Sequence, residues 1–142
     1  MTLELFSYTV PLPFVFALAL LITFDYITGY ADAWLRKKVD STVGIDGLIR
    51  KGSIIFAAIA FILFDAITGF DVMSILPNEV KEYTAIFGIT QFGLAEILII
   101  GFCLNELTSV FENLDKLGIP LPKFVTKRLN KIKDSYFESE EK

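Results

Sequence analysis

Three long apolar runs, separated by segments rich in charge or in glycine and proline, dominate the hydrophobic pattern of the chain. As a helix that rises about 1.5 Å per residue, each run is long enough to cross a hydrocarbon layer of about 30 Å. The pattern therefore predicts membrane-spanning helices at residues 11–35, 52–70 and 84–104. A soluble helical bundle is the alternative, but a small globule has too little interior to hide three such runs from water.

A helical pattern of apolar positions continues after the third run, through residues 105–114. Residues 117–122 hold one glycine and two prolines, which end a regular helix. From residue 123 onward, apolar positions recur at helical spacing among basic residues. This pattern predicts a basic amphipathic cytoplasmic helix that lies on anionic lipid, with a solvated tail as the alternative. We expect a transmembrane domain at residues 1–122 and this tail at residues 123–142.

Basic residues are distributed unevenly between the predicted connections. Residues 36–51 hold five of them, residues 71–83 hold only Lys81, and the C-terminal segment is basic again. By the positive-inside rule, the first connection and the C-terminus lie in the cytoplasm and the N-terminus lies outside. The predicted fold class is therefore an all-α membrane protein with three transmembrane helices. The basic residues expected at the membrane surface are Arg36, Lys37, Lys38, Arg50, Lys51, Lys127, Arg128 and Lys131.

Composition supports a membrane protein and argues against an enzyme. The chain of 142 residues is 54% hydrophobic with a mean hydropathy of +0.57, values too high for a soluble domain of this length. It has no histidine, and its single cysteine, Cys103, cannot form a disulfide within the chain. We therefore expect no enzymatic activity, no metal or other cofactor and no nucleic-acid partner. No basic cluster precedes the first apolar run, so we do not expect a cleaved signal peptide.

A repeated segment places carboxylates inside two of the apolar runs. Residues 24–30 and 64–70 share the pattern Phe-Asp-x-Ile-Thr-Gly-aromatic, which in a helix puts the aspartate, threonine and glycine on one face. An ionisable group in a membrane span costs a few kcal/mol and needs a partner, and small residues let helices approach closely. The residues expected to pack helices or to line an aqueous lesion are Asp25, Thr28, Gly29, Asp32, Asp65, Thr68, Gly69, Gln91 and Glu96.

Three roles compete for these carboxylates: hydrogen-bonded groups within a helix bundle, contacts between subunits, and the lining of a lesion. A position near the headgroups is a further alternative for Asp25 and especially for Asp32. The predicted topology places Asp65 near the outer boundary of the membrane and Glu96 near its middle. Asp25 and Asp65 of one subunit are therefore not expected to pair. We expect the partner of each aspartate to lie on another helix, either of the same subunit or of another one.

Three segments, in this order, resemble a family of phage holins that includes the holin-like proteins of clostridial toxin secretion. They lie at residues 24–29, 43–51 and 105–123, and the resemblance covers about residues 22–129. One departure is Leu107-Thr108, where the family pattern has a glycine and a small apolar residue; it affects the close packing of that turn. The family motif positions in the third segment are Asn105, Glu106, Glu112, Asn113, Gly118 and Pro120.

The resemblance implies a protein that associates with itself in the bacterial cytoplasmic membrane. At a set time it opens lesions through which a cytoplasmic peptidoglycan hydrolase, called an endolysin, or a toxin escapes without binding to it directly. The residues alone leave two alternatives open. A small ion channel or transporter subunit would use the intramembrane carboxylates as a cation path. A membrane scaffold would recruit a cytoplasmic partner through its basic connection and tail.

Overall fold

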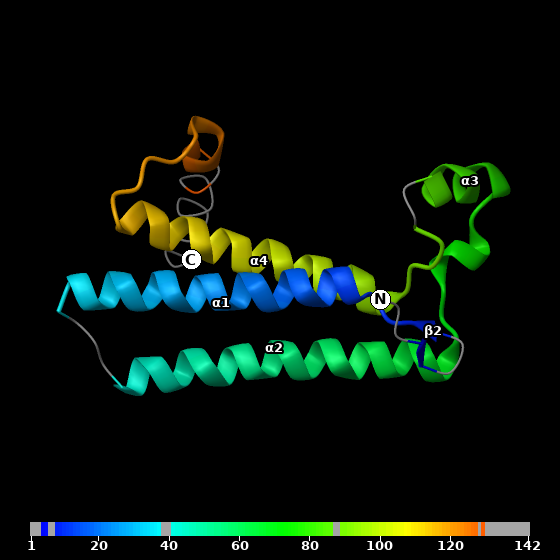
Figure 1. Ribbon diagram of the computed structural model, residues 1–142, viewed down its shortest axis with the longest axis horizontal. Helices are drawn as coiled ribbons and strands as arrows, with labels where there is room; N and C mark the ends of the chain where they lie inside the picture. Colours follow the sequence, from blue (N-terminus) through cyan, green and yellow to red (C-terminus); the bar gives the residue numbers. More distant parts are fainter. Residues whose placement is uncertain (1–3, 6–7, 38–40, 87–88, 128, 130–142) are drawn as a thin grey trace, which may run out of the picture. The chain divides into compact units, whose positions relative to one another are not determined.

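The computed structural model describes residues 4–5, 8–37, 41–86, 89–127 and 129, which are mostly helical (Figure 1). A short antiparallel hairpin precedes the helices, and its register pairs Glu4 with Thr9 and Leu5 with Tyr8. Residues 123–127 and 129 form a further helical segment after the last long helix. The elements are β1 (Glu4–Leu5), β2 (Tyr8–Thr9), α1 (Leu12–Leu35), α2 (Ser41–Thr68), η1 (Val72–Ile75), α3 (Asn78–Ile86) and α4 (Leu94–Lys116).

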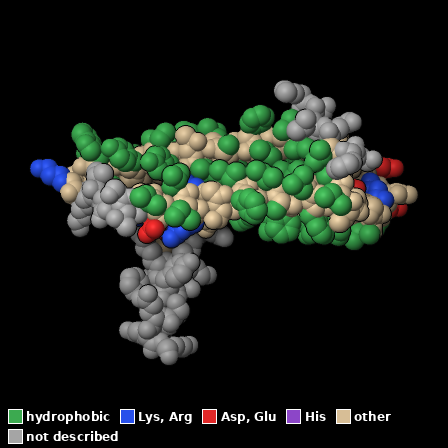
Figure 2. Space-filling view, turned by 90° about the horizontal axis from the view of Figure 1, so that it is seen from below, with side chains coloured by type: hydrophobic (Ala, Val, Ile, Leu, Met, Phe, Trp, Pro, Cys, Tyr) green, Lys and Arg blue, Asp and Glu red, His purple; other side chains and the backbone are tan. Residues whose placement is uncertain are grey.

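Three of these helices are long and apolar enough to cross a membrane: Leu12–Leu35, Gly44–Thr68 within α2, and Leu94–Lys116. Only 11%, 6% and 28% of the residues in their most apolar windows are buried inside the chain. Their apolar side chains therefore face outward, as Figure 2 shows on one side of the molecule. Outward-facing apolar helices are stable in lipid rather than in water. The prediction of an all-α protein with three membrane spans is confirmed.

The chain divides into two compact units, and α1 and α4 each contribute to both. Unit 1 consists of Met1–Ala19 and Ser41–Cys103, and unit 2 consists of Leu20–Asp40 and Leu104–Lys142. In unit 1, the hairpin packs on the last turns of α2, where Tyr8, Val10 and Ala66 form a small buried cluster. The hairpin is thereby held next to the C-terminus of α2. The predicted boundary between residues 122 and 123 stays a prediction.

The second span differs from its predicted bounds because α2 begins at Ser41. Residues 41–51 lie within the segment 36–51 that the sequence predicted as a connection, and they include Gly44 and Gly47. A glycine costs a helix only about 1 kcal/mol relative to alanine. This cost is small enough for the helix to continue through both glycines.

The third span is displaced toward the C-terminus relative to the predicted range of 84–104. Residues 84–86 belong to α3, and α4 begins only at Leu94. The predicted extension through residues 105–114 is confirmed, since α4 ends at Lys116. Gly118 then adopts a positive φ of 75°, and the Ile119 amide bonds the Leu114 carbonyl at 3.0 Å. This pattern is a glycine-dependent helix C-cap, which confirms the predicted stop.

Candidate functional site

Two carboxylates cap the N-terminus of α4 in unit 1. The Ala95 amide donates to Asp65 Oδ2 at 2.7 Å, and the Gly93 amide donates to Glu96 Oε2 at 2.7 Å. The first amides of a helix have no partner within the helix, and the positive end of its dipole attracts anions. Glu96, three residues after the N-cap glycine, reaches back to that residue as in a capping box. Asp65 lies in α2, and its carboxylate accepts the amide hydrogen bond that the side chain of an N-cap residue would otherwise accept, because Gly93 has no side chain.

Gly93 makes this arrangement possible because it has no side chain. A Cβ atom at this position would lie 2.8 Å from the carboxyl carbon of Asp65 and 3.2 Å from the carbonyl oxygen of Phe70. Both distances are shorter than ordinary van der Waals contact. The Phe70 oxygen belongs to the backbone, and the Asp65 carboxylate is held in place by its hydrogen bond to the Ala95 amide. Gly93 is therefore the residue that lets α2 approach the first turn of α4.

Tyr8 covers the same carboxylates from the hairpin. Its hydroxyl donates to Glu96 Oε1 at 2.9 Å, and its side chain is 2% exposed. Burial raises the pKa of Tyr8 above its ordinary value, and the hydrogen bond to Glu96 and the negative charges of Glu96, Asp65 and Asp71 raise it further. Tyr8 therefore remains a neutral hydrogen-bond donor, so that both Glu96 oxygens have a donor.

The carboxylate of Asp65 is only partly satisfied. Asp65 is 0% exposed and Glu96 3% exposed, and the Oδ1 atom of Asp65 has no hydrogen-bond partner in the described part of the chain. An unsatisfied buried acceptor costs roughly 1–3 kcal/mol. The helix terminus offsets part of this cost. Glu96 lies in the first turn of α4 and not in the middle of a helix.

The connection before α4 is held by two further polar side chains. Asp71 Oδ1 accepts from the Met73 amide and from the Phe92 amide, both at 3.0 Å. Gln91 Oε1 accepts from the Thr9 amide at 3.1 Å, and therefore ties the connection to the hairpin. Gln91 lies between α3 and α4, although the predicted span of residues 84–104 included it. Asp71 was missed by sequence reasoning, although an aspartate just before a helical turn is a common N-cap signal.

In unit 2, the predicted polar face of α1 contacts α4 through Asn113. The Asn113 Nδ2 atom donates to Asp25 Oδ1 at 2.8 Å and lies 3.4 Å from Thr28 Oγ1. Gly29 leaves room for this amide, since a Cβ at that position would lie 3.3 Å from Asn113 Nδ2. The inference that Asp25 has its partner on another helix agrees with this geometry. The partner lies in α4 of the same chain.

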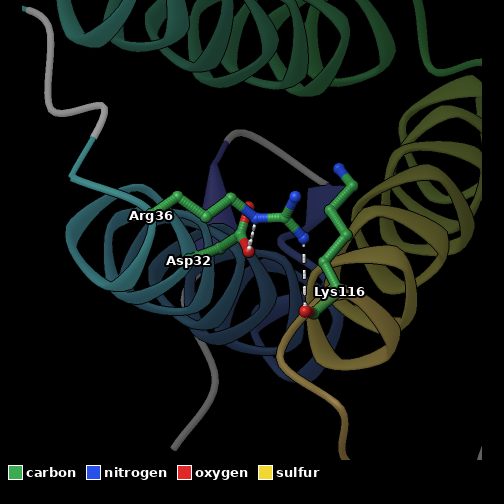
Figure 3. A network of polar contacts seen from close by, with 3 residues as sticks. All are labelled: Asp32, Arg36 and Lys116. Carbon is green, nitrogen blue, oxygen red and sulfur yellow. Dashed lines mark hydrogen bonds and ion pairs between the residues drawn. The ribbon is translucent and has the colours of Figure 1, made fainter.

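One helical turn further along α1, Asp32 and Arg36 form a second contact with α4 (Figure 3). Arg36 Nε lies 2.7 Å from Asp32 Oδ1, and Arg36 Nη2 donates to the Lys116 carbonyl at 3.3 Å. The ion pair is partly exposed, so it contributes only about 0–1 kcal/mol. Its larger effect is to supply a donor to the last turn of α4, where carbonyl groups lack partners. Arg36 thus makes an intramolecular contact.

In both copies of the repeated segment the threonine hydroxyl donates to the phenylalanine carbonyl four residues earlier at 2.8 Å, but the glycines differ. In the second copy, Thr68 Oγ1 bonds the Phe64 carbonyl at 2.8 Å, and the Gly69 amide bonds the Asp65 carbonyl at 2.8 Å. Gly69 has a φ of +66°, and a Cβ atom added there would have no neighbour within 4 Å. Gly69 therefore ends α2 instead of joining a helix-packing face as predicted.

The other motif positions lie along α4 and its C-terminal cap. Glu106 is buried at 3% exposure, Glu112 and Asn113 are half-buried, and Asn105 is exposed. Gly118 forms the cap, and Pro120 is an exposed residue after it.

The predicted basic surface is only partly described. Lys37 has a positive φ of 54° just after α1, where a glycine is usual. Arg50 and Lys127 are exposed, whereas Lys51 is half-buried in α2. Lys38, Arg128 and Lys131 lie outside the described residues. Among the residues with described coordinates, no group of three His, Cys, Asp or Glu side chains is placed to hold a metal ion.

Comparison with known proteins matches this chain to one family. The profile of the bacteriophage holin family matches residues 8–134. The holin-like protein TcdE of Clostridioides difficile is 29% identical over 122 residues, which cover 86% of this chain and 72% of the relative. The uncharacterized protein YqxH of Bacillus subtilis is 28% identical over 122 residues, 86% of this chain and 73% of the relative. No solved structure matches the chain significantly.

Proposed function

The chain belongs to the bacteriophage holin family, and from this premise we propose that it opens timed lesions in the bacterial cytoplasmic membrane that release a peptidoglycan hydrolase or a toxin. Family membership and the three apolar helices make it a multi-pass protein of that membrane. The lesion would form by association of many copies, because one chain offers too little polar surface to line an opening wide enough for a protein. The released enzyme needs no binding site on the chain, and we expect the chain to catalyse no reaction.

The observation that carries this proposal is the burial of carboxylates against helix termini and amides within a largely apolar surface. Asp65 and Glu96 are almost inaccessible, and the Asp65 cap leaves one oxygen without a partner. Water would satisfy that oxygen once the helices separate, so exposure of this cluster favours a water-lined state. Before the lesion forms, each chain would expose apolar side chains to lipid and keep these carboxylates buried. In the lesion, the assembled chains would expose the carboxylates to water.

The proposed orientation follows from the distribution of charge. Five basic residues lie at residues 36–51, around the end of α1 and the start of α2, against one at residues 71–83. We propose that the former segment and the C-terminus face the cytoplasm and that the hairpin faces outward. On this orientation, the cluster of Tyr8, Asp65 and Glu96 lies near the outer boundary, and the Asp32–Arg36 contact lies near the inner one.

Co-expression with a hydrolase tests the function. The protein is expressed alone, and together with a cytoplasmic muralytic enzyme that has no export signal. We expect abrupt loss of viability in both cultures and lysis only in the pair, because the enzyme must cross the membrane to reach the cell wall. Viability loss with selective ion flux but no lysis in the pair would instead identify an ion channel. Absence of both effects would refute the proposal.

A further inference from the structure

An apolar groove lies in unit 2 between the second half of α4 and the helical segment that begins at residue 123, where the chain turns back (Figure 1). Its volume is about 350 Å³, within the lower part of the range of roughly 300–1,000 Å³ typical of small-molecule sites. The residues that line it are mainly Leu104, Leu107, Phe111, Phe124, Val125 and Leu129. Thr108 also lines it, but its hydroxyl already donates to the Leu104 carbonyl at 2.8 Å. The groove therefore suits a hydrocarbon chain.

The packing of the C-terminal segment builds this groove. The glycine cap at Gly118 ends α4, and the Val125 amide bonds the Pro122 carbonyl at 2.9 Å to begin the next helical turn. Val125 and Leu129 are buried at 7% and 3% exposure, whereas Phe124 is 76% exposed. The segment is thus anchored by two side chains and leaves a large aromatic ring at the edge of the groove. An exposed aromatic ring beside basic residues is typical of a membrane interface.

The charge of the segment indicates the head group of the occupant. Residues 117–133 contain five basic residues and no acidic residue. Lys123 and Lys127, which flank the groove residues Phe124 and Val125 in the chain, are exposed. Basic side chains next to an apolar groove are complementary to an amphiphile with an anionic head and a hydrocarbon tail. In a membrane protein, the abundant molecule with that chemistry is an anionic phospholipid.

We infer that this groove holds an acyl chain of an anionic phospholipid whose phosphate is attracted by Lys123 and Lys127. The lipid would fasten the C-terminal segment to the membrane surface and complete its packing against α4. This inference requires only a membrane protein and does not depend on lesion formation, so a failure of either proposal leaves the other standing.

Fluorescence quenching tests the inference in vesicles. Trp34 is the only tryptophan, so a Trp34→Phe, Phe111→Trp variant of the full chain carries one reporter in the groove. It is placed in phosphatidylcholine vesicles with equal small fractions of either brominated phosphatidylglycerol or brominated phosphatidylcholine. We expect several-fold stronger quenching by the anionic lipid. Adding Lys123→Gln and Lys127→Gln should weaken that preference roughly tenfold, since each cation near the surface contributes to anionic-lipid binding.

Two controls make the outcome decisive. Arg50→Gln with Lys81→Gln removes the same charge from unit 1 and should keep the preference. Thr108→Phe fills the groove and should lower quenching by the anionic lipid even if the lysine variants fold poorly. Equal quenching by both lipids, or an unchanged preference in the Lys123/Lys127 variant, would overturn the inference. So would reporter fluorescence that ignores brominated lipid but changes with protein density, because a second copy would then occupy the groove.

Discussion

Gly93 combines two properties at one position, because it is the residue just before α4 and also the site where the Asp65 carboxylate of α2 fills the space that a side chain would need. A serine or aspartate there would cap its own helix, yet its Cβ would overlap the Asp65 carboxylate. The chain instead takes its cap from a side chain 28 positions earlier, and so couples the end of α2 to the start of α4 through one hydrogen bond of 2.7 Å. Loss of this bond would leave the Ala95 amide without its cap, while Glu96 still accepts from the Gly93 amide.

A Gly93→Ala substitution should therefore destabilise the protein, by roughly 1–3 kcal/mol, the usual cost of inserting a methyl group into a filled site. Gly101→Ala is the matched control, since Gly101 lies within α4 and nothing is within 4 Å of its Cβ position. That substitution should be neutral or stabilising by up to about 1 kcal/mol. Unfolding in a denaturing detergent, followed by circular dichroism, measures both. Equal effects would show that Gly93 does not make room for Asp65.

At the scale of elements, polar contacts connect α1 and α4 in unit 2. The Asn113 amide donates a hydrogen bond to the Asp25 carboxylate, and the Arg36 guanidinium donates one to the Lys116 carbonyl. Polar contacts between helices in lipid contribute roughly 0.6–2 kcal/mol each, which is small enough to break during a rearrangement. The proposed function requires contacts of this strength, since helices that never separate cannot expose their polar faces.

Asn113→Asp should shorten the time to lysis in cells that also express a muralytic enzyme. The new carboxylate would lie beside that of Asp25, in place of an amide at 2.8 Å, and like charges at this distance repel by up to a few kcal/mol. Asn105→Asp makes the same chemical change at an exposed position of α4 and should alter the lysis time much less. An equal shift in both variants would mean that added charge, and not the α1–α4 contact, sets the timing.

The sequence predicted features that depend on residues close together in the chain. It did not predict features that depend on residues far apart in the chain. The face of Asp25, Thr28 and Gly29 follows from helical spacing alone, and α4 does contact it. The cap of α4 could not be predicted, because it joins residues distant in sequence and uses a glycine where serine or threonine is the usual signal. The predicted start of the second span, residue 52, was wrong because the glycines and charges of residues 36–51 indicated a connection. The helix begins at Ser41 instead.

At the scale of the whole molecule, the proposed topology has the Tyr8, Asp65 and Glu96 cluster near the outer boundary of the membrane. It has the Asp32–Arg36 contact near the inner boundary. Single cysteines introduced in a Cys103→Ser background test this arrangement. A cysteine at Glu79, in α3, should react with a membrane-impermeant thiol reagent added to intact spheroplasts. A cysteine at Lys123 should react only after the membrane is permeabilised. The reverse pattern would invert the orientation. Labelling of both sites before lesions open, while the spheroplasts still retain a cytoplasmic fluorescent protein, would show that α4 does not cross the membrane.

The central claim is that this protein opens lesions wide enough for folded proteins, and simultaneous release of a small ion and a large protein tests it most directly. Spheroplasts that contain a cytoplasmic fluorescent protein are induced to express the chain, and external potassium and fluorescence are followed together in time. We expect both to appear abruptly and at the same moment. Sustained potassium release with the fluorescent protein retained would contradict it, because a conduit that passes only ions cannot export a hydrolase.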